Sequence, residues 1–186
     1  IQRQLVSDVP VCTFLSGGID SSIISKIASD TMPLHTFSLE FLNNAEQFKV
    51  GLSGECADEL FGGYPWFAKD YNSFPWIQSI HERDELLKPT IREALNLTKT
   101  LDELYNKAIE PVSKESKHHQ LLYLNQQYFM QTLLERKDRM SMAQGLEVRV
   151  PFADHELVEY VWHIPHEMKR MGGVEKGLLR HAFNRH

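Results

Sequence analysis

The chain has 186 residues, of which 42% are hydrophobic and 24% charged, a composition typical of an ordinary soluble globular protein. Its net charge of -5 argues against a nucleic-acid-binding surface, which normally carries a basic stripe. Cys12 and Cys56 are too few for a disulfide framework and form no CxxC pair, so we expect buried thiols in a reducing compartment. No stretch approaches the roughly 20 apolar residues that span a bilayer, and no signal peptide opens the chain. We therefore predict a cytoplasmic protein.

The N-terminal part of the chain contains one pattern twice. An apolar run over residues 9–16 ends at a glycine turn, and isoleucines at helical spacing follow over residues 19–30. Residues 48–52 form a second apolar run, followed by a Ser-Gly turn and an acidic helix start. Between the two, the alternating residues 33–41 predict another strand. Two strand-turn-helix units predict an α/β fold with a parallel sheet.

The connection between the strands at 33–41 and 48–52 poses a geometric difficulty. Parallel strands need a crossover of about a dozen or more residues, but only residues 42–47 stand between these two. Either the two strands are antiparallel, or the sequence joins segments that are not contiguous in a parent chain. We favour a missing crossover segment around Asn43 to Glu46.

The rest of the chain is predicted to be mainly helical. The aromatic group in GGYPWF, residues 62–67, is interpreted as packing rather than as a stacking platform. Asp154 can cap the helix that follows it, and Pro165 ends that helix. The predicted elements are loops and short helices over 64–100, helices over 101–143 (most clearly 117–143), an extended turn-rich link over 145–154, and helices over 155–164 and 173–183.

The first chemistry-bearing stretch is TFLSGGIDSS, residues 13–22. Gly17 and Gly18 allow a sharp turn that brings backbone amides close to a ligand. The helix that follows contributes unpaired N–H groups and the positive end of its dipole, which together favour an anion. Asp20 fits beside a polyanion only if a cation such as Mg²⁺ bridges them. An ordinary strand-helix turn with Ser and Asp caps is an equally good interpretation, and there is no Walker A lysine. The hydroxyl donors are Ser16, Ser21 and Ser22.

The second stretch, LSGECADELFGGY, repeats the Ser-Gly turn at Ser53 and Gly54. Glu55 and Asp58 follow three residues apart, so both could face the same side if a helix starts here. The alternative is that these acids simply favour a helix N-terminus. Two such turns after apolar strands could supply one metal with carboxylates at the carboxyl ends of neighbouring strands, where ligands bind in open α/β sheets.

The third stretch, ERKDRMSMAQGLEVRVPFAD, is rich in cations. They could neutralise phosphates or a substrate carboxylate, although surface charges with ordinary salt bridges are the better interpretation of this stretch alone. The nine histidines show no metal-ligand spacing, and no supported Ser-His-Asp or Cys-His pattern occurs. The candidate cations are Arg136, Lys137, Arg139 and Arg149.

Three stretches resemble, in order, the three signatures of the synthetase domain of glutamine-dependent asparagine synthetases. They are LSGGIDSS, SGECADELFGGY and DRMSMAQGLEVRVPFADHELVE. The closing GGVEKGLLRHAF is similar as well, and the resemblance leaves out only residues 71–114. It implies a doubly wound, parallel-sheet fold of the adenine nucleotide alpha hydrolase type with an added helical C-terminal part. It also implies that ATP activates the side-chain carboxylate of aspartate as β-aspartyl-AMP, and that ammonia from glutamine displaces AMP to give asparagine.

The resemblance assigns roles to individual residues. Mg²⁺ would be held by Asp20 and Asp58, and Glu55 would be the catalytic acid tied to forming or using the adenylate. The implied ATP contacts are Leu15, Ser16, Gly17, Gly18, Ile19, Asp20, Ser21, Ser22, Leu39, Ser53 and Gly54.

The chain also departs from the family pattern. No glutaminase domain precedes Ile1, the crossover near residues 43–46 is short, and the chain stops at His186, before the segment that carries the family's catalytic lysine. Lys176 does not match that lysine, so we give it no role here. We therefore predict an incomplete synthetase domain over residues 1–186 that is a weak or inactive catalyst by itself. Robust aspartate-dependent exchange of pyrophosphate into ATP would contradict this.

Rival interpretations remain open. A sister amidoligase, such as a β-lactam-forming synthetase, shares the fold and the first loop, but we expect it to diverge at Glu55 because it handles no ammonia. Relatives that make GMP, NAD or modified tRNA lack the third motif. A nucleotide-binding remnant without turnover is also compatible with the sequence, and so is an oligomer.

Overall fold

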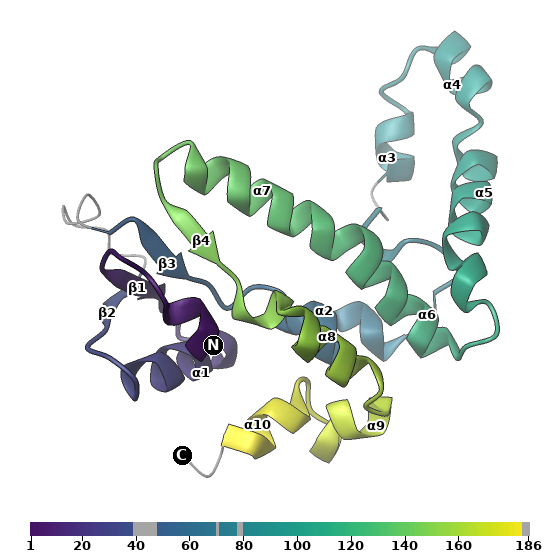
Figure 1. The fold of residues 1–186 in the computed structure, drawn as a ribbon. Helices are drawn as coiled ribbons and strands as arrows, with labels where there is room; N and C mark the ends of the chain where they lie inside the picture. Colours follow the sequence, from purple (N-terminus) through teal and green to yellow (C-terminus); the bar gives the residue numbers. More distant parts are fainter. Residues whose placement is uncertain (39–47, 70, 78–79, 184–186) are drawn as a thin grey trace. The chain divides into compact units, whose positions relative to one another are not determined.

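The computed structural model describes residues 1–38, 48–69, 71–77 and 80–183 (Figure 1). The chain divides into two compact units, each with apolar clusters of its own. One unit comprises Ile1–Gly63 and Met130–His186, and the other comprises Tyr64–Phe129. Every predicted site residue falls in the first unit, which we call the sheet unit.

Within its described residues, the sheet unit is built on a four-stranded sheet with the order β2-β1-β3-β4. All three strand pairs are parallel, so the predicted parallel α/β fold is confirmed. Thr13 of β1 aligns with Thr36 on one side and with Leu52 on the other. The strands are β1 (Val11–Phe14), β2 (His35–Phe37), β3 (Val50–Leu52) and β4 (Glu147–Arg149).

The structure excludes one alternative for the sheet and corrects one expectation. β2 and β3 are not an antiparallel pair, because they flank β1 on opposite sides and both run parallel to it. The predicted gap around Asn43 to Glu46 lies outside the described residues. The predicted link over 145–154 is wrong in part, because Glu147–Arg149 forms the edge strand β4. Leu146, Val148 and Val150 alternate with charged residues, which is a strand pattern, and pairing with β3 makes this segment part of the sheet.

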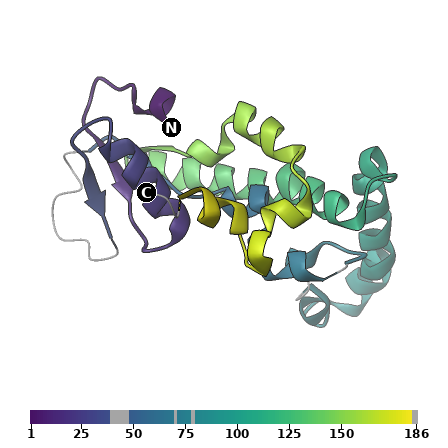
Figure 2. The same cartoon turned by 90° about the horizontal axis from the view of Figure 1, so that it is seen from below.

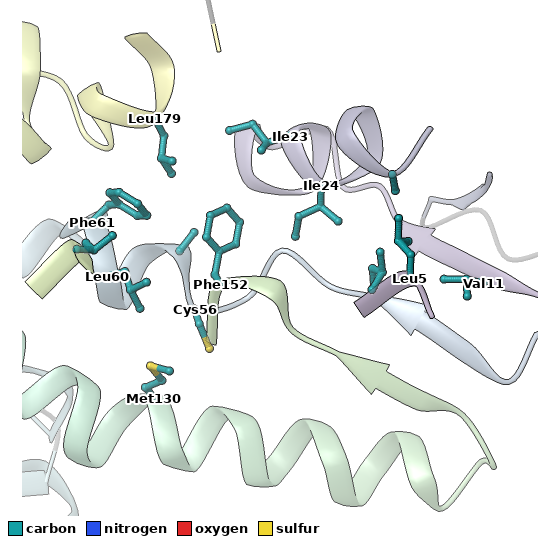
Figure 3. Packing of buried hydrophobic residues seen from close by; sticks show 14 of the residues in the cluster. Leu5, Val11, Ile23, Ile24, Cys56, Leu60, Phe61, Met130, Phe152 and Leu179 are labelled. Carbon is teal, nitrogen blue, oxygen red and sulfur yellow. The ribbon is translucent and has the colours of Figure 1, made fainter. Parts of the chain in front are cut away.

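Helices cover both faces of the sheet. Figure 3 shows α1 and α7 on opposite sides of the strands, and Figures 1 and 2 agree with that placement. This is the arrangement of a doubly wound sheet, and it follows from crossover connections between parallel strands. The helices of the sheet unit are α1 (Ile19–Ser29), α2 (Ala57–Phe61), α7 (Met130–Met142), α8 (His155–Trp162), α9 (His166–Lys169) and α10 (Gly177–Phe183).

One apolar core holds these elements together (Figure 3). Ile23 and Ile24 are consecutive residues of α1, and both are buried because that helix packs its apolar face on β1. Leu52 of β3 is fully buried between the helical layers, and Met130 enters from α7. Burial of several such side chains, each worth about 1.5–3 kcal/mol, is the main stabilisation of the unit.

The two predicted C-terminal helices form with shifted ends. Asp154 caps α8 as expected, its side chain accepting a hydrogen bond from the Glu156 amide at 3.1 Å. α8 ends at Trp162, before Pro165, which instead precedes α9. The last helix begins at Gly177 rather than at residue 173, because Lys176 has a left-handed backbone with φ 53°.

The second unit, residues 64–129, consists of short helices and aromatic contacts, as predicted. The rings of Tyr64 and Trp66 stack at 4.3 Å, and Phe129 packs against both edge-on. Asn125 begins a π-helical segment within the predicted helix 117–143. The helices are α3 (Ile80–Asp84), α4 (Pro89–Leu95), α5 (Leu97–Ile109) and α6 (Lys117–Leu124); single 3-10 turns lie at Pro65–Ala68, Pro75–Ile77 and Glu110–Val112, and the π segment at Asn125–Phe129. In the described part of the chain, no helix is long and apolar enough to cross a membrane.

A buried lysine outside the candidate site gives a pH-dependent prediction. Lys169 at the end of α9 is 1% exposed, and burial lowers its pKa to about 8. Between this value and the unfolded value near 10.5, the unfolded chain binds more protons than the folded one, so stability rises with pH. Below pH 8 both states are protonated, and the full penalty of the buried charge, about 2–3 kcal/mol, persists.

Lys169→Met should therefore raise the free energy of unfolding by about 2 kcal/mol at pH 7, and by much less at pH 10. Urea unfolding at the two pH values measures this, with the exposed Lys99→Met as the matched control. An equal effect of Lys169→Met at both pH values would mean that packing of the lysine stem, not its charge, decides stability.

Candidate active site

The first predicted loop lies at the carboxyl end of β1 and leads into α1. Gly17 has φ 78°, a left-handed conformation that favours glycine, whereas Gly18 has an ordinary φ of -77° and is the N-cap of α1. The first helical hydrogen bond of α1 runs from the Ser22 amide to the Gly18 carbonyl at 3.1 Å. The amides of Ser16 and Gly18 donate to the hydroxyls of Ser21 and Ser16 at 3.2 and 3.4 Å. Those of Gly17, Ile19 and Asp20 precede the first helical bond, where an anion can bind. The loop therefore has the backbone geometry that anion binding needs.

The serine hydroxyls of this loop bond to the loop itself. Ser21 and Ser22 donate to the Gly18 carbonyl at 3.1 and 2.9 Å, and the Ser16 hydroxyl lies 3.1 Å from that of Ser21. Donation to a phosphate would require these hydroxyls to rotate away from Gly18. Leu15 is half-buried, and its amide donates to Phe37 of the neighbouring strand at 2.8 Å. Leu39, the other predicted nucleotide contact, lies outside the described residues.

The second loop lies at the carboxyl end of β3 and packs directly on the first. A Cβ added to Gly54 would meet the Ser21 amide nitrogen at 2.8 Å and the Asp20 Cβ at 3.2 Å, so glycine permits the contact. The Ser53 side chain is buried, and its hydroxyl accepts from the Glu55 amide at 3.4 Å. Because β1 and β3 are adjacent and parallel, both loops meet at the same edge of the sheet.

The structure brings Asp20 and Asp58 together around one cation that the sequence interpretation left without a role. Lys176 Nζ lies 2.5 Å from Asp20 Oδ2 and 2.7 Å from Asp58 Oδ1. Lys176 is 9% exposed, so this bridge is largely removed from water. The two carboxylates are thus neighbours, as a shared metal would require.

The pKa directions in this cluster reflect burial opposed by charge. Burial raises the pKa of the Asp20 carboxyl, and the hydrogen bond and charge of Lys176 oppose this rise only in part. Burial alone would lower the pKa of Lys176, but the hydrogen bonds and charges of Asp20 and Asp58 outweigh it, so the pKa is raised. Lys176 is therefore an ammonium at neutral pH.

The donor set fits Mg²⁺ bound together with phosphate. Asp20 Oδ1 is buried and has no hydrogen-bond partner, so one carboxylate oxygen is free for a ligand. Among the described residues, no group of three or more His, Cys, Asp or Glu side chains could hold a metal by itself. Mg²⁺ is commonly held by one or two carboxylates plus phosphate oxygens and water, which matches a two-carboxylate site beside an anion loop.

Gly63 lines this cluster and gives a testable prediction. A Cβ there would lie 1.9 Å from Asp58 Oδ1 and 2.4 Å from Lys176 Cε. Both atoms belong to side chains that can move, so Gly63→Ala should displace the Asp58 carboxylate rather than unfold the chain. We expect Mg²⁺-dependent ATP binding to weaken about ten-fold, as for other residues that orient a metal ligand, and calorimetric titration measures it.

The control for Gly63→Ala is Gly145→Ala. Gly145 has φ 68° and open space around its added Cβ, so this change should cost about 1 kcal/mol of stability without affecting ATP binding. Equal ATP affinities of Gly63→Ala and the unmodified protein would show that the Asp58 position does not matter for nucleotide binding.

Glu55 and Asp58 do not lie on one helix face, contrary to the expectation for a helix that starts before Glu55, and they pair with different lysines. Cys56 adopts φ 72° and caps α2, which begins at Ala57, so Glu55 precedes the helix and points elsewhere. Its Oε1 lies 3.2 Å from Lys137 Nζ and 3.8 Å from Arg136 Nη2 of α7. Its Oε2 is buried without a hydrogen-bond partner.

Glu55 lines a pocket of about 390 Å³ with two cations in its wall. The ammonium of Lys137 also lies over the Phe14 ring, 5.4 Å from its centre, at the end of β1. With Arg136 and Lys137 against one carboxylate, the wall is net positive, which suits a small acidic substrate. The lining residues are Phe14, Glu55, Arg136, Lys137, Met140, Ser141, Leu146 and Val148.

The other two predicted cations have ordinary roles. Arg139 pairs with Glu135 one turn earlier on α7. Arg149 pairs with Glu147 and donates to the carbonyls of Gln4 and Val6 at 2.7 Å. Arg139 thus forms a salt bridge within α7, and Arg149 joins β4 to the N-terminal segment, which agrees with the ordinary salt bridges expected of this stretch alone.

A larger, mainly apolar pocket of about 440 Å³ lies between α1, α8 and α10. Its acids, Asp154 and Glu156, are both paired with Arg3. Neither Asp20 nor Asp58 lines it, so we do not place the chemistry there.

Comparison with known proteins agrees with the sequence resemblance. The family described as asparagine synthase matches residues 1–47 and 42–186. The chain is 38% identical to the glutamine-hydrolyzing asparagine synthetase 3 of Bacillus subtilis (strain 168) over 267 residues, covering 98% of this chain and 44% of that protein. It is 28% identical to the glutamine-hydrolyzing asparagine synthetase of Homo sapiens, covering 98% of this chain and 37% of that protein.

The chain therefore spans less than half the length of these relatives. The Bacillus alignment is longer than the 186 residues of this chain, so that relative carries additional residues within the matched stretch. The family match covers the whole chain in two stretches, and the identity to one relative is 38% across nearly all of it. The chain belongs to the asparagine synthase family.

Proposed function

We propose that this chain is the ATP-binding synthetase region of an enzyme that converts aspartate to asparagine through β-aspartyl-AMP. The observation that carries the proposal is the meeting of Asp20 and Asp58 at the carboxyl ends of β1 and β3, beside a loop that leads into the N-terminus of α1. The cation-lined pocket at Glu55 adds a place for the acidic substrate. We assign glutamine hydrolysis, which the relatives' names include, to parts of such proteins outside the matched stretch. We also propose that the chain is cytoplasmic. We propose further that its crossover near residues 43–46 is shorter than in the relatives, and the longer Bacillus alignment supports this second point.

In the first step, a side-chain carboxylate oxygen of aspartate attacks the α-phosphorus of ATP. The bond between the α-phosphorus and the bridging oxygen breaks, and pyrophosphate leaves. The amides at Gly17 to Asp20 would receive the negative charge that develops on the leaving group, since they point from a helix N-terminus. Mg²⁺ bound by Asp20 and Asp58 would neutralise phosphate charge.

In the second step, ammonia attacks the activated carbonyl carbon. The carbon–oxygen bond to AMP breaks, so AMP keeps one oxygen of the original carboxylate, and the nitrogen loses a proton. Glu55 has a buried oxygen without a partner and can accept that proton or orient ammonia. Lys137 and Arg136 would pair with a carboxylate of aspartate and hold it against the loop.

Equilibrium binding of labelled aspartate tests this function without requiring turnover. With a non-hydrolysable ATP analogue and Mg²⁺ present, we expect saturable binding of L-aspartate and at least ten-fold weaker binding of L-glutamate. Lys137→Met should weaken aspartate binding about ten-fold, whereas Lys26→Met, which removes an exposed lysine on α1, should leave it unchanged. Equal binding of both amino acids, or none, would contradict the proposal.

A further inference from the structure

Lys176 is a charged residue of the Asp20–Asp58 cluster that the proposed reaction does not use. It comes from the segment before α10 and contacts Asp20, which lies 156 positions earlier in the chain, and Asp58. Its side chain is 11% exposed, compared with 17% for Asp20 and 30% for Asp58. The lysine is therefore the most buried of the three charged side chains, and its ammonium lies between the two carboxylates that would share a metal.

The backbone around Lys176 is built to deliver this side chain. Its φ of 53° is unfavourable for a residue with a Cβ, so the surrounding contacts must hold it there. Gly177 begins α10 where no Cβ fits, because one would lie 2.0 Å from the Met171 carbonyl oxygen. On the other side, Gly63 leaves room for Lys176 Cε. Strain and two tight glycine contacts at one lysine indicate a specific role for its position.

The charges explain what the lysine does in the absence of ligands. Asp20 and Asp58 would repel each other in a partly buried site if no cation lay between them. An ammonium at 2.5 and 2.7 Å supplies that cation. A divalent cation shared by Asp20 and Asp58 would lie between the two carboxylates, where the ammonium now lies, so both cations cannot occupy that place together.

We propose that Lys176 is the internal counter-ion of the Asp20–Asp58 pair and competes with the divalent cation for it, so that metal and polyphosphate bind together. On metal entry, the ammonium would leave the carboxylates and pair with a phosphate oxygen, as lysine does in other phosphate sites. Metal alone binds weakly because it must displace an ammonium that has no new partner. Lys176 is thus a positioning residue, and the inference rests on the two-carboxylate metal site of the proposed function.

Binding of Mn²⁺ alone, followed by electron paramagnetic resonance of the free ion, tests the competition. We expect Lys176→Met to bind Mn²⁺ with a dissociation constant at least ten-fold lower than that of the unmodified protein. Adding pyrophosphate should tighten Mn²⁺ binding to the unmodified protein much more than to Lys176→Met, because only the former has an ammonium to transfer. Lys26→Met removes the same charge from an exposed pair on α1 and should bind Mn²⁺ as the unmodified protein does.

Thermal melting provides the second measurement and checks folding. In a chelator, Lys176→Met should melt several degrees below the unmodified protein, because two carboxylates are left uncompensated, and Mn²⁺ should restore most of the loss. If Mn²⁺ binds Lys176→Met no more tightly than the unmodified protein, the competition is wrong while the metal site stands. If Mn²⁺ binds neither protein even with pyrophosphate, the metal site of the proposed function fails as well.

Discussion

Replacement of Asp58 by asparagine should weaken Mg²⁺-dependent ATP binding about a hundred-fold or more, because even residues that only orient metal ligands contribute 10–100-fold. The substitution keeps the shape of the side chain but removes the charge, and Lys176 retains its contact with Asp20. The effect should be much smaller when Mg²⁺ is replaced by a chelator, since neither protein then has a metal contact at Asp58 to lose. Equilibrium dialysis of labelled ATP, with and without Mg²⁺, measures both values.

Asp30→Asn is the matched control for Asp58→Asn. Asp30 lies at the end of α1, is exposed and pairs with Lys26, so its loss should leave ATP binding unchanged. An Asp58→Asn protein that binds ATP as tightly as Asp30→Asn in the presence of Mg²⁺ would remove Asp58 from the metal site.

Replacement of Gly177 by alanine should destabilise the sheet unit by about 3 kcal/mol or more. The added Cβ would lie 2.0 Å from the carbonyl oxygen and 2.6 Å from the amide nitrogen of Met171. Both are backbone atoms, so the Met171–Gly173 turn must move away from α10, and the Lys176 ammonium must move with it. We expect the melting temperature to fall by roughly 10 °C or more.

Gly172→Ala is the control for this change. Gly172 lies in the same turn with φ 74°, but its added Cβ would meet nothing within 4 Å. Only the left-handed backbone then penalises the substitution, by about 1–2 kcal/mol. If both variants melt at the same temperature, the close approach of Gly177 to Met171 does not stabilise the fold.

Local pattern predicts the central strands well and the edge strand poorly. Val11–Phe14 and Val50–Leu52 are apolar runs bounded by turns, so their state is determined by their own residues. Glu147–Arg149 lies in a short alternation of apolar and charged residues, which does not by itself distinguish a sheet strand from an extended link; its pairing with β3 does. Partners far away in the sequence cannot be recognised from a local pattern.

The same distinction applies to the site. The two loops could be predicted because glycine, serine and acidic residues cluster there, and parallel strands bring their carboxyl ends together. The sequence could not predict that Glu55 and Asp58 have separate partners, because their separation depends on the left-handed backbone of Cys56. Lys176 was missed because its contacts lie more than a hundred residues away, although the resemblance already marked GGVEKGLLRHAF as a shared segment.

The most direct test of aspartate adenylation at this site is the affinity for a stable analogue of β-aspartyl-AMP, because it requires no turnover. The site should bind β-aspartyl-AMP more tightly than ATP or aspartate, since the intermediate contacts the nucleotide and aspartate parts of the site at once. We predict 1:1 calorimetric binding at least a hundred-fold tighter than that of AMP or aspartate alone, weakened by Glu55→Gln and by Lys137→Met. An analogue that binds no tighter than AMP, or no tighter than its glutamyl counterpart, would contradict the account.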